Sequence, residues 1–240
     1  MVDKLAGSKI LAVGHSVVNG ELTVVKDLAW GTHILAEGLT QSGGIAELIW
    51  KSTFKKINAK KKNAKSVLIL GLGGGGIAKL VRKHWPKVKM VGVDIDPVIV
   101  NLGRKYMKLD KYGVEIVIAD AFDFVGAKSK APNYAKATLG RQRAKKQTKP
   151  TTTHQPQPTT YDLICVDMYV GDEYPKKFES QDFIEGVKKL VAADGVAIFN
   201  RLYYGEKRKE AVKFGNVLEK IFSKVEVVYP EANVMFLTKS

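Results

Sequence analysis

The stretch VLILGLGGGGIAKLV, residues 67–81, constrains the fold more than any other part of the chain. An apolar run leads directly into a loop in which five of six residues are glycine, and an amphipathic pattern follows. Glycines let a chain turn sharply after a strand and approach a ligand closely, while the next helix offers free N–H groups to an anion. The stretch therefore predicts a strand–loop–helix unit whose Gly71, Gly73 and Gly75 lie against a ligand, either a dinucleotide or a nucleoside sulfonium.

The residues after position 65 alternate between strand-like and helix-like patterns. Strand-like segments are 67–70, 88–94, 114–119, 162–167, 196–200, 225–229 and 234–238, and helix-like segments are 77–85, 97–107, 181–193 and 207–222. This alternation predicts an α/β fold with a Rossmann-like seven-stranded sheet and helices on both faces. The connection between the last two strands is too short for a parallel crossover, so they should form an antiparallel hairpin at the sheet edge.

The first forty residues have a different, β-rich pattern. Asn19-Gly20 predicts a two-residue hairpin turn, because both central positions of such a turn favour positive φ. From residue 43 onwards, apolar residues recur at helical spacing. We therefore place a small N-terminal β-hairpin region at residues 1–42 and a Rossmann-like domain at residues 43–240.

The net charge of +15 is concentrated in two segments. Residues 126–160 hold eight lysines and arginines and no aspartate or glutamate, and a lysine-rich block covers residues 51–65. The composition of residues 126–160 predicts a flexible insert. Its charge suits either a solvated surface or contact with a polyanion such as nucleic acid.

Composition also narrows the class of protein. No run of 18 or more residues is apolar enough to span a bilayer, and the N-terminus lacks a signal-peptide pattern. The single cysteine, Cys165, excludes an intramolecular disulfide and a cysteine-based zinc cluster. The four histidines show no metal-ligand spacing, so we expect a cytoplasmic protein with no bound metal.

Two aspartates follow the second and third strands of the alternating pattern. Asp94 ends the segment KMVGVD, where a carboxylate accepts hydrogen bonds from both hydroxyls of a ribose. NAD and S-adenosylmethionine both carry this ribose, so Asp94 leaves the choice of ligand open. Asp120 precedes the small residue Ala121, and in S-adenosylmethionine enzymes a carboxylate there receives the adenine amino group. A helix cap is the alternative role for Asp120, but its position and the terminal hairpin together favour S-adenosylmethionine.

Taken in order, these motifs resemble the spermidine synthase-like group. DLAWGTHILAEGLTQ is similar to the group's N-terminal segment and VLILGLGGGGIAKLV to its glycine loop, and VGVDIDPVIV, VIADAFDFV and YDLICVDMYVG follow in the expected order. The resemblance implies a methyltransferase-type Rossmann-like domain with a small β-lid, and S-adenosylmethionine or its decarboxylated form as cofactor. It leaves a homodimer open, and it implies a cofactor site lined by Gln41, Asp94, Ile95, Asp120, Ala121 and Asp167.

The chain departs from the group's aminopropyltransferases where they bind polyamines. Gly74 stands where their glycine loop has an acidic residue, and Trp50 and Lys51 stand where their first helix has a tyrosine–glutamine pair. In DMYVG, Asp167 keeps the first aspartate of their DSSDP motif, whereas Val170 replaces the second, which deprotonates the attacking amine. A polyamine carries several positive charges and requires several carboxylates, so these losses argue against aminopropyl transfer.

What remains favours a methyltransferase whose acceptor is an amine, of a small molecule or of a protein. Asp167, at the end of the fourth strand, is the candidate proton acceptor, with a cofactor or cap contact as an equal alternative. Tyr169 is the candidate wall of the acceptor pocket. Asp172 and Glu173 keep open an aminopropyltransferase with a shifted acidic loop, and a non-catalytic polyanion-binding homologue is the second alternative.

Overall fold

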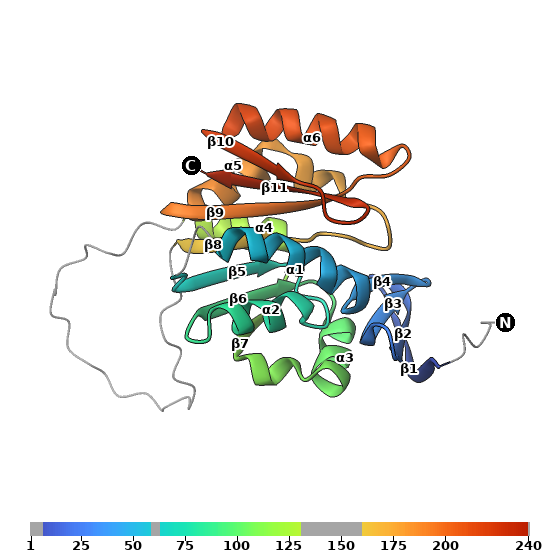
Figure 1. The fold of residues 1–240 in the computed structure, drawn as a ribbon. Helices are drawn as coiled ribbons and strands as arrows, with labels where there is room; N and C mark the ends of the chain where they lie inside the picture. The colour runs from blue at the N-terminus through green and yellow to red at the C-terminus, as the bar shows by residue number, and fades with distance from the viewer. Residues whose placement is uncertain (1–6, 59–62, 131–159, 240) are drawn as a thin grey trace, which may run out of the picture.

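Two β-sheets organise the chain in the computed structural model, which describes residues 7–58, 63–130 and 160–239 (Figure 1). A four-stranded antiparallel sheet comes first, and a seven-stranded mixed sheet with helices on both faces follows. This is the predicted α/β class, with the small N-terminal β-region ahead of the larger sheet. In Figure 1 the small sheet lies beside one end of the large one, at the right of the view.

The N-terminal sheet is a meander of β1 (Lys9–Ser16), β2 (Gly20–Asp27), β3 (Gly31–Ala36) and β4 (Leu39–Ser42). The β1–β2 hairpin was predicted correctly, but its turn was not. Ser16 pairs with Gly20, so the loop has three residues, and Gly20 alone adopts a positive φ of 66°. The prediction failed because Asn19-Gly20 also suits a three-residue loop that ends in a left-handed glycine.

The large sheet has the order β10-β11-β9-β8-β5-β6-β7. Strands β9, β8, β5, β6 and β7 are parallel, with β7 at one edge of the sheet, whereas β11 is antiparallel to both β9 and β10. The predicted antiparallel hairpin at the sheet edge is therefore confirmed. The strand bounds are β5 (Ser66–Leu70), β6 (Lys89–Asp94), β7 (Val114–Ile118), β8 (Tyr161–Val166), β9 (Val191–Leu202), β10 (Lys224–Val228) and β11 (Asn233–Lys239).

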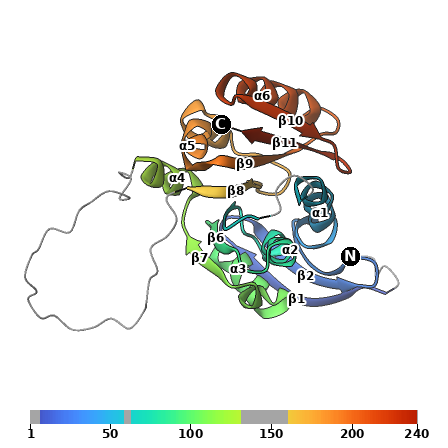
Figure 2. The same cartoon turned by 60° about the vertical axis from the view of Figure 1, so that its left-hand side comes forward.

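The helices divide between the two faces of the large sheet (Figure 2). Along β5, Val67 and Ile69 pack with the α1–α3 side, whereas Leu68 and Leu70 pack with the α4–α6 side. This alternation follows from the period of two along a strand, and apolar residues on both faces suit a parallel sheet covered on both sides. The helix bounds are α1 (Gly44–Asn58), α2 (Gly76–His84), α3 (Pro97–Met107), α4 (Ala121–Lys130), α5 (Gln181–Leu190) and α6 (Lys207–Ile221), with 3-10 turns at Leu109–Tyr112 and Lys176–Glu179.

The predicted first residues of the helices agree with the structure better than the predicted last residues do. Asp96 caps α3 ahead of Pro97, and Ser180 caps α5 through a hydrogen bond from the Phe183 amide. Helix α5 ends at Leu190 instead of continuing to residue 193, because β9 begins at Val191 and joins the sheet there. Helix α4 was not predicted, and it includes residues 126–130 of the expected insert. The rest of that insert, residues 131–159, lies outside the described residues.

Candidate functional site

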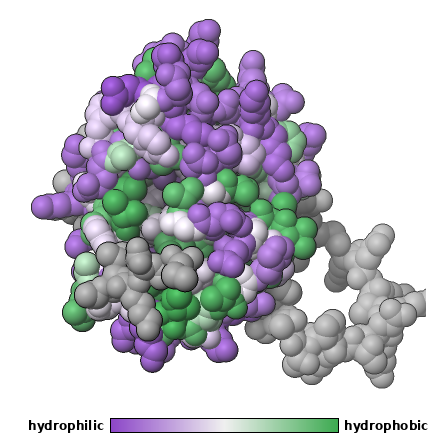
Figure 3. Space-filling view, turned by 90° about the vertical axis from the view of Figure 1, so that its right-hand side faces the viewer, coloured by the Kyte–Doolittle hydropathy of each residue, from purple (hydrophilic) through white to green (hydrophobic). Residues whose placement is uncertain are grey.

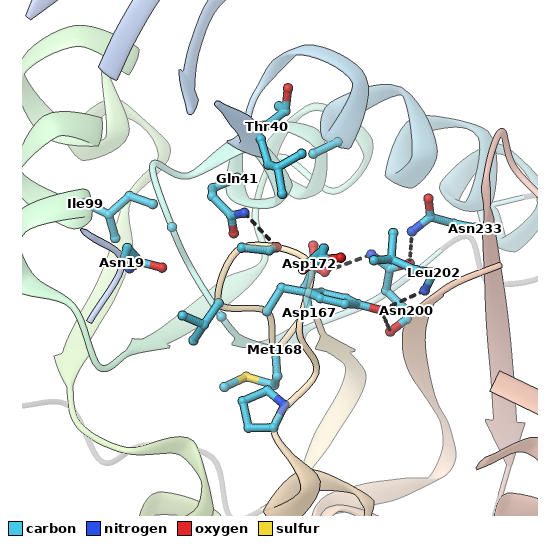
Figure 4. Close-up of a pocket in the computed structure, with 18 of the residues that line it drawn as sticks. Asn19, Thr40, Gln41, Ile99, Asp167, Met168, Asp172, Asn200, Leu202 and Asn233 are labelled. Atoms are coloured by element: carbon cyan, nitrogen blue, oxygen red, sulfur yellow. Dashed lines mark hydrogen bonds between the residues drawn. The ribbon is translucent and has the colours of Figure 1, made fainter. Parts of the chain in front are cut away.

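A cavity of about 530 Å³ lies between the carboxyl ends of the parallel strands and the N-terminal sheet (Figure 4). Its wall combines residues of β4, the glycine loop after β5, the ends of β6 to β9, and the β10–β11 turn. Ligands of open α/β sheets bind at this edge because the loops after the strands converge there. The cavity is therefore the candidate functional site.

The glycine loop fits its neighbours only because it lacks side chains. Gly71 adopts a φ of 85°, and a Cβ there would lie 2.0 Å from the Asp167 carbonyl oxygen, so the loop passes directly over the end of β8. Gly73 adopts a φ of 54° and lines the cavity. Gly75 is placed differently: it precedes α2 with a φ of 93°, packs against Leu109 and is absent from the cavity wall. Its role in this structure is to turn the chain into α2.

Asp94 organises the loop as well as the cavity wall. Its carboxylate accepts hydrogen bonds from the Gly73 amide at 2.7 Å and from the Asp96 amide at 2.9 Å. Burial raises the pKa of this carboxyl, and the two amide donors partly oppose that shift. An ionised carboxylate held in this way keeps lone pairs that can accept from ligand hydroxyls.

The ends of β6 and β7 form one half of the cavity, here called the base end because the sequence predicts a nucleobase there. Ile95 and Ala121 contribute apolar wall. Asp120 caps α4 by accepting from the Phe122 amide at 2.8 Å, and its other oxygen pairs with the Lys177 ammonium. Asp120 thus combines the helix-cap role with a place on the cavity wall, and the two interpretations from sequence do not exclude each other.

Asp167 lies at the end of β8, at the centre of a polar network (Figure 4). One carboxylate oxygen accepts from the Trp50 indole at 2.7 Å, and the other accepts from the Asn200 amide at 2.8 Å. Asn233 in turn donates to the Asn200 side-chain oxygen at 2.8 Å. Burial raises the pKa of Asp167, and the hydrogen bonds from Asn200 and Trp50 offset part of the shift. The network fixes the carboxylate while keeping it on the cavity wall.

Tyr169 lines the cavity with its ring, while its hydroxyl points to β9. The hydroxyl accepts a 2.7 Å hydrogen bond from the Leu202 amide and lies 3.5 Å from the Asn200 carbonyl oxygen. Burial raises the pKa of this phenol well above its ordinary value of 10.0. A phenol with a raised pKa is a poor proton acceptor, so the geometry favours the wall role.

The loop that follows Tyr169 forms the other half of the cavity, here called the acceptor end. Val170 and Glu173 pair through two backbone hydrogen bonds, and Gln41 of β4 donates to the Gly171 carbonyl at 2.9 Å. Lys207, at the start of α6, lies 2.5 Å from Glu173 and 3.8 Å from Asp172. The loop is therefore held from both sides, and its two acidic residues share one lysine.

Comparison with known proteins places the chain in a family. Residues 55–232 match the model described as the spermine/spermidine synthase domain. The chain belongs to this family. Members of the family use S-adenosylmethionine or decarboxylated S-adenosylmethionine as co-substrate.

The relatives of this spermidine synthase family member divide between two reactions. The chain is 25% identical over 157 residues to the mouse "eEF1A lysine and N-terminal methyltransferase", covering 62% of the chain and 19% of that protein. It is 28% identical over 149 residues to the polyamine aminopropyltransferase of Chromobacterium violaceum, covering 61% and 46%. The chain thus spans less than half the length of these curated relatives. Spermidine synthase from Thermotoga maritima shares the fold, with a TM-score of 0.68 and 19% identity over 97% of the chain and 72% of that structure.

The positions at which the chain departs from the aminopropyltransferases are now visible in three dimensions. A Cβ at Gly74 would lie 2.6 Å from the Met107 sulfur and 2.7 Å from Ile34, so a side chain there requires both of these side chains to shift. Trp50 is buried and reaches the site only through its bond to Asp167, whereas Lys51 is exposed and off the cavity wall. In this structure Met107 and Ile34 occupy the space beside residue 74.

The structure brings together the predicted site residues, Gly75 excepted, and adds others. Asn19, Thr40, Lys177, Asn200 and Asn233 also line the cavity. Asn19 donates to Asp96 at 2.6 Å, which ties the β1–β2 turn to the start of α3. Asn200 ends a predicted strand, so its position was a usable signal. The other four come from turns or antiparallel strands that reach the site only through the tertiary fold.

Proposed function

We propose that the chain is an S-adenosylmethionine-dependent methyltransferase whose acceptor is an amine, with an amine of a protein favoured. The observation that carries this proposal is the pairing of the charged residues in the acceptor-end loop. Position 170 is valine, and Asp172 and Glu173 are both paired with Lys207. A polyamine needs several uncompensated carboxylates, whereas a single amine does not.

The base end suits the adenosyl part of the cofactor. Asp94 presents an ionised carboxylate to ribose hydroxyls, and Asp120 presents one to an exocyclic amino group. Gly71 and Gly73 let the backbone approach the ligand, and Ile95 supplies apolar wall for a base. The donor set therefore fits S-adenosylmethionine, which supplies a methyl group activated by a positively charged sulfur.

The charges at the acceptor end favour a cationic or neutral amine over an anionic acceptor. Asp167, Asp172 and Glu231 all line this half of the cavity. They would repel the phosphates of a nucleic acid, whose binding depends on lysines and arginines at the contact. Because Lys207 already compensates Asp172, the net attraction suits one amine group.

The rim of the cavity favours a protein over a free small amine. Leu39, Ile45, Val170 and Tyr204 line the cavity and keep between 38% and 46% of their surface exposed. Figure 3 looks onto this side of the molecule and shows hydrophobic residues gathered across its middle. Exposed apolar surface around a polar site is typical of a macromolecular contact, because a small amine would leave it uncovered.

The chain's own residues align the amine and remove its proton. A lysine amine has a pKa of about 10.4, so it must lose a proton before it attacks. Asp167 is fixed by Trp50 and Asn200 and has a raised pKa, which suits a proton acceptor at the acceptor end. Tyr169 and Val170 line the cavity beside it. Holding both reactants in line supplies up to about 7–11 kcal/mol of the barrier.

Two assays run in parallel test the proposal. Radiolabelled S-adenosylmethionine is offered with peptides that carry a free N-terminal amine, a lysine, or neither. Decarboxylated S-adenosylmethionine is offered with putrescine and spermidine, and methylthioadenosine release is measured. Label transfer to amine-bearing peptides, with no methylthioadenosine, is the expected result. Calorimetry that detects no binding of S-adenosylmethionine or S-adenosylhomocysteine would remove the proposal.

Aminopropyl transfer is the second candidate, and Asp172 is the observation that favours it. This carboxylate lies on the cavity wall, and 45% of its side chain is exposed. The same assay decides, since methylthioadenosine release with an amine would establish this reaction.

A polyanion contact through the basic insert remains a separate proposal, because residues 131–159 lie outside the described residues. Within the described ranges, no helix is long and apolar enough to cross a membrane.

A further inference from the structure

The base end of the cavity carries an ion pair that the sequence did not predict. Lys177 and Asp120 are 57 residues apart in the chain, yet the Lys177 ammonium contacts Asp120 Oδ2, and both residues line the cavity. Asp120 Oδ1 already caps α4 through the Phe122 amide. The cavity therefore presents a strong donor beside a strong acceptor at the place that suits the base.

The lysine backbone is fixed even though its side chain reaches solvent. Lys177 belongs to the 3-10 turn Lys176–Glu179, which is anchored by the buried Phe178. The Phe178 ring packs against Phe183 at 5.0 Å and Tyr174 at 6.3 Å. The Lys177 side chain keeps 46% of its surface exposed, and its ammonium has two hydrogens beyond the one that contacts Asp120.

Electrostatics favours keeping this pair intact when a base binds. The Asp120 side chain is only 19% exposed, and a base stacked beside it would cover it further. Losing the lysine at that moment would leave a carboxylate in a drier environment with only neutral donors, which is costly. The ammonium is thus expected to stay at the base end and share its remaining hydrogens.

Adenine offers the complementary pattern. Its exocyclic amino group is a donor, and the ring nitrogen beside it on either edge, N1 or N7, is an acceptor. We propose that Lys177 is a specificity-determining residue that reads adenine together with Asp120, the carboxylate accepting from the amino group and the ammonium donating to the neighbouring ring nitrogen. This inference rests on the proposed function, because it assigns a role within the same cofactor site.

Binding measurements test the inference without requiring turnover. S-adenosylhomocysteine and its 1-deaza and 7-deaza analogues are titrated by calorimetry into the wild type, Lys177→Met and Lys176→Met. Lys176 is the matched control, because it is an exposed lysine of the same turn that does not line the cavity. Thermal unfolding without ligand checks that all three proteins are folded.

We expect Lys177→Met to weaken S-adenosylhomocysteine binding about three- to tenfold, a partly exposed charged hydrogen bond being weaker than a buried one. The wild type should reject one of the two analogues by a similar factor, and Lys177→Met should lose that discrimination. Lys176→Met should behave as the wild type does. Unchanged binding by Lys177→Met, or equal binding of both analogues by the wild type, would overturn the inference.

Two further outcomes separate this inference from the proposed function. Tighter binding by Lys177→Met would mean that the ammonium competes with adenine for Asp120, which contradicts the role proposed here but leaves the function standing. If S-adenosylhomocysteine binds to none of the three folded proteins, the proposed function fails and this inference fails with it.

Discussion

Replacing Trp50 with phenylalanine isolates the bond that fixes Asp167. Trp50 is 1% exposed and packs edge-on to Phe54, and its indole N–H donates to the Asp167 carboxylate at 2.7 Å. Phenylalanine keeps most of the aromatic packing but cannot donate. The substitution therefore removes one hydrogen bond to a carboxylate and a small part of the buried apolar volume.

The two losses can be given separate magnitudes. A hydrogen bond to a charged group contributes about 1.5–3 kcal/mol to the free energy of unfolding. The lost apolar atoms equal about two buried methylene groups, or about 1.6 kcal/mol. The bond also lowers the pKa of Asp167, so its loss should raise that pKa further.

Trp85→Phe shows the effect of shortening an indole away from Asp167, because Trp85 is 4% exposed, contacts the same Phe54 and does not line the cavity. Urea denaturation should show that the stability lost by Trp50→Phe at neutral pH exceeds the packing loss of about 1.6 kcal/mol by about 1.5–3 kcal/mol. A raised native pKa means that ionised Asp167 costs stability as pH rises through it. The excess should therefore shrink as the medium is acidified and Asp167 takes up a proton.

Either of two results would refute this reasoning. If Trp50→Phe loses no more at neutral pH than the packing loss of about 1.6 kcal/mol, the indole bond contributes nothing measurable and Asp167 is fixed by other groups. If the excess persists unchanged in acid, or if Trp85→Phe shows the same pH dependence, the excess does not depend on the charge of Asp167.

Three further predictions concern the two halves of the cavity. Asp94→Asn should weaken S-adenosylhomocysteine binding about ten- to hundredfold in calorimetry. Binding to the wild type should also weaken as pH falls through the raised pKa of Asp94, beginning above the ordinary value of 3.8. Wild-type binding that does not change with pH would contradict this prediction. Gly74→Asp should lower the unfolding free energy by about 3 kcal/mol or more in urea denaturation, because it places a charge against Met107 and Ile34, and it should not create methylthioadenosine release. Lys207→Met should bind putrescine up to about fivefold more tightly than the wild type, because it frees Asp172 and Glu173. The strength of an exposed ion pair sets the upper limit of this gain. Equal putrescine affinities of the variant and the wild type would show that Lys207 does not neutralise the two loop carboxylates.

The residues of the base end could be predicted from the sequence because each of them belongs to a local sequence pattern. The glycine loop, Asp94 and Asp120 each follow a strand with a strong apolar pattern, and the carboxyl ends of parallel strands meet at one edge. The order of the glycine loop, Asp94 and Asp120 along the chain therefore predicted that they lie close together in space. Gly75 lies at the turn into α2 and off the cavity wall, because the spacing of a glycine motif does not distinguish glycines that line a cavity from those that turn the chain into a helix.

The acceptor end and the ion pair at the base end were less predictable, because both depend on contacts between distant elements. Lys207 meets Asp172 and Glu173 across 34 or more residues, and Lys177 meets Asp120 across 57. No local pattern distinguishes these lysines from the many others in a chain with a net charge of +15. Their partners became visible only when the loop after β8 was placed against α4 and α6.

The two halves of the cavity differ in how closely they are tied to the sheet. The base end is built from backbone turns and strand ends that also carry the fold, since Gly71 lies against the Asp167 carbonyl and Asp94 holds the glycine loop. Changing it would disturb the sheet. The acceptor end is built from side chains on a loop held by Gln41 and Lys207, whose exchange leaves the sheet intact. Under the proposed function, Val170 and Lys207 determine the acceptor and the base end binds the cofactor, so the two halves must be tested by separate variants.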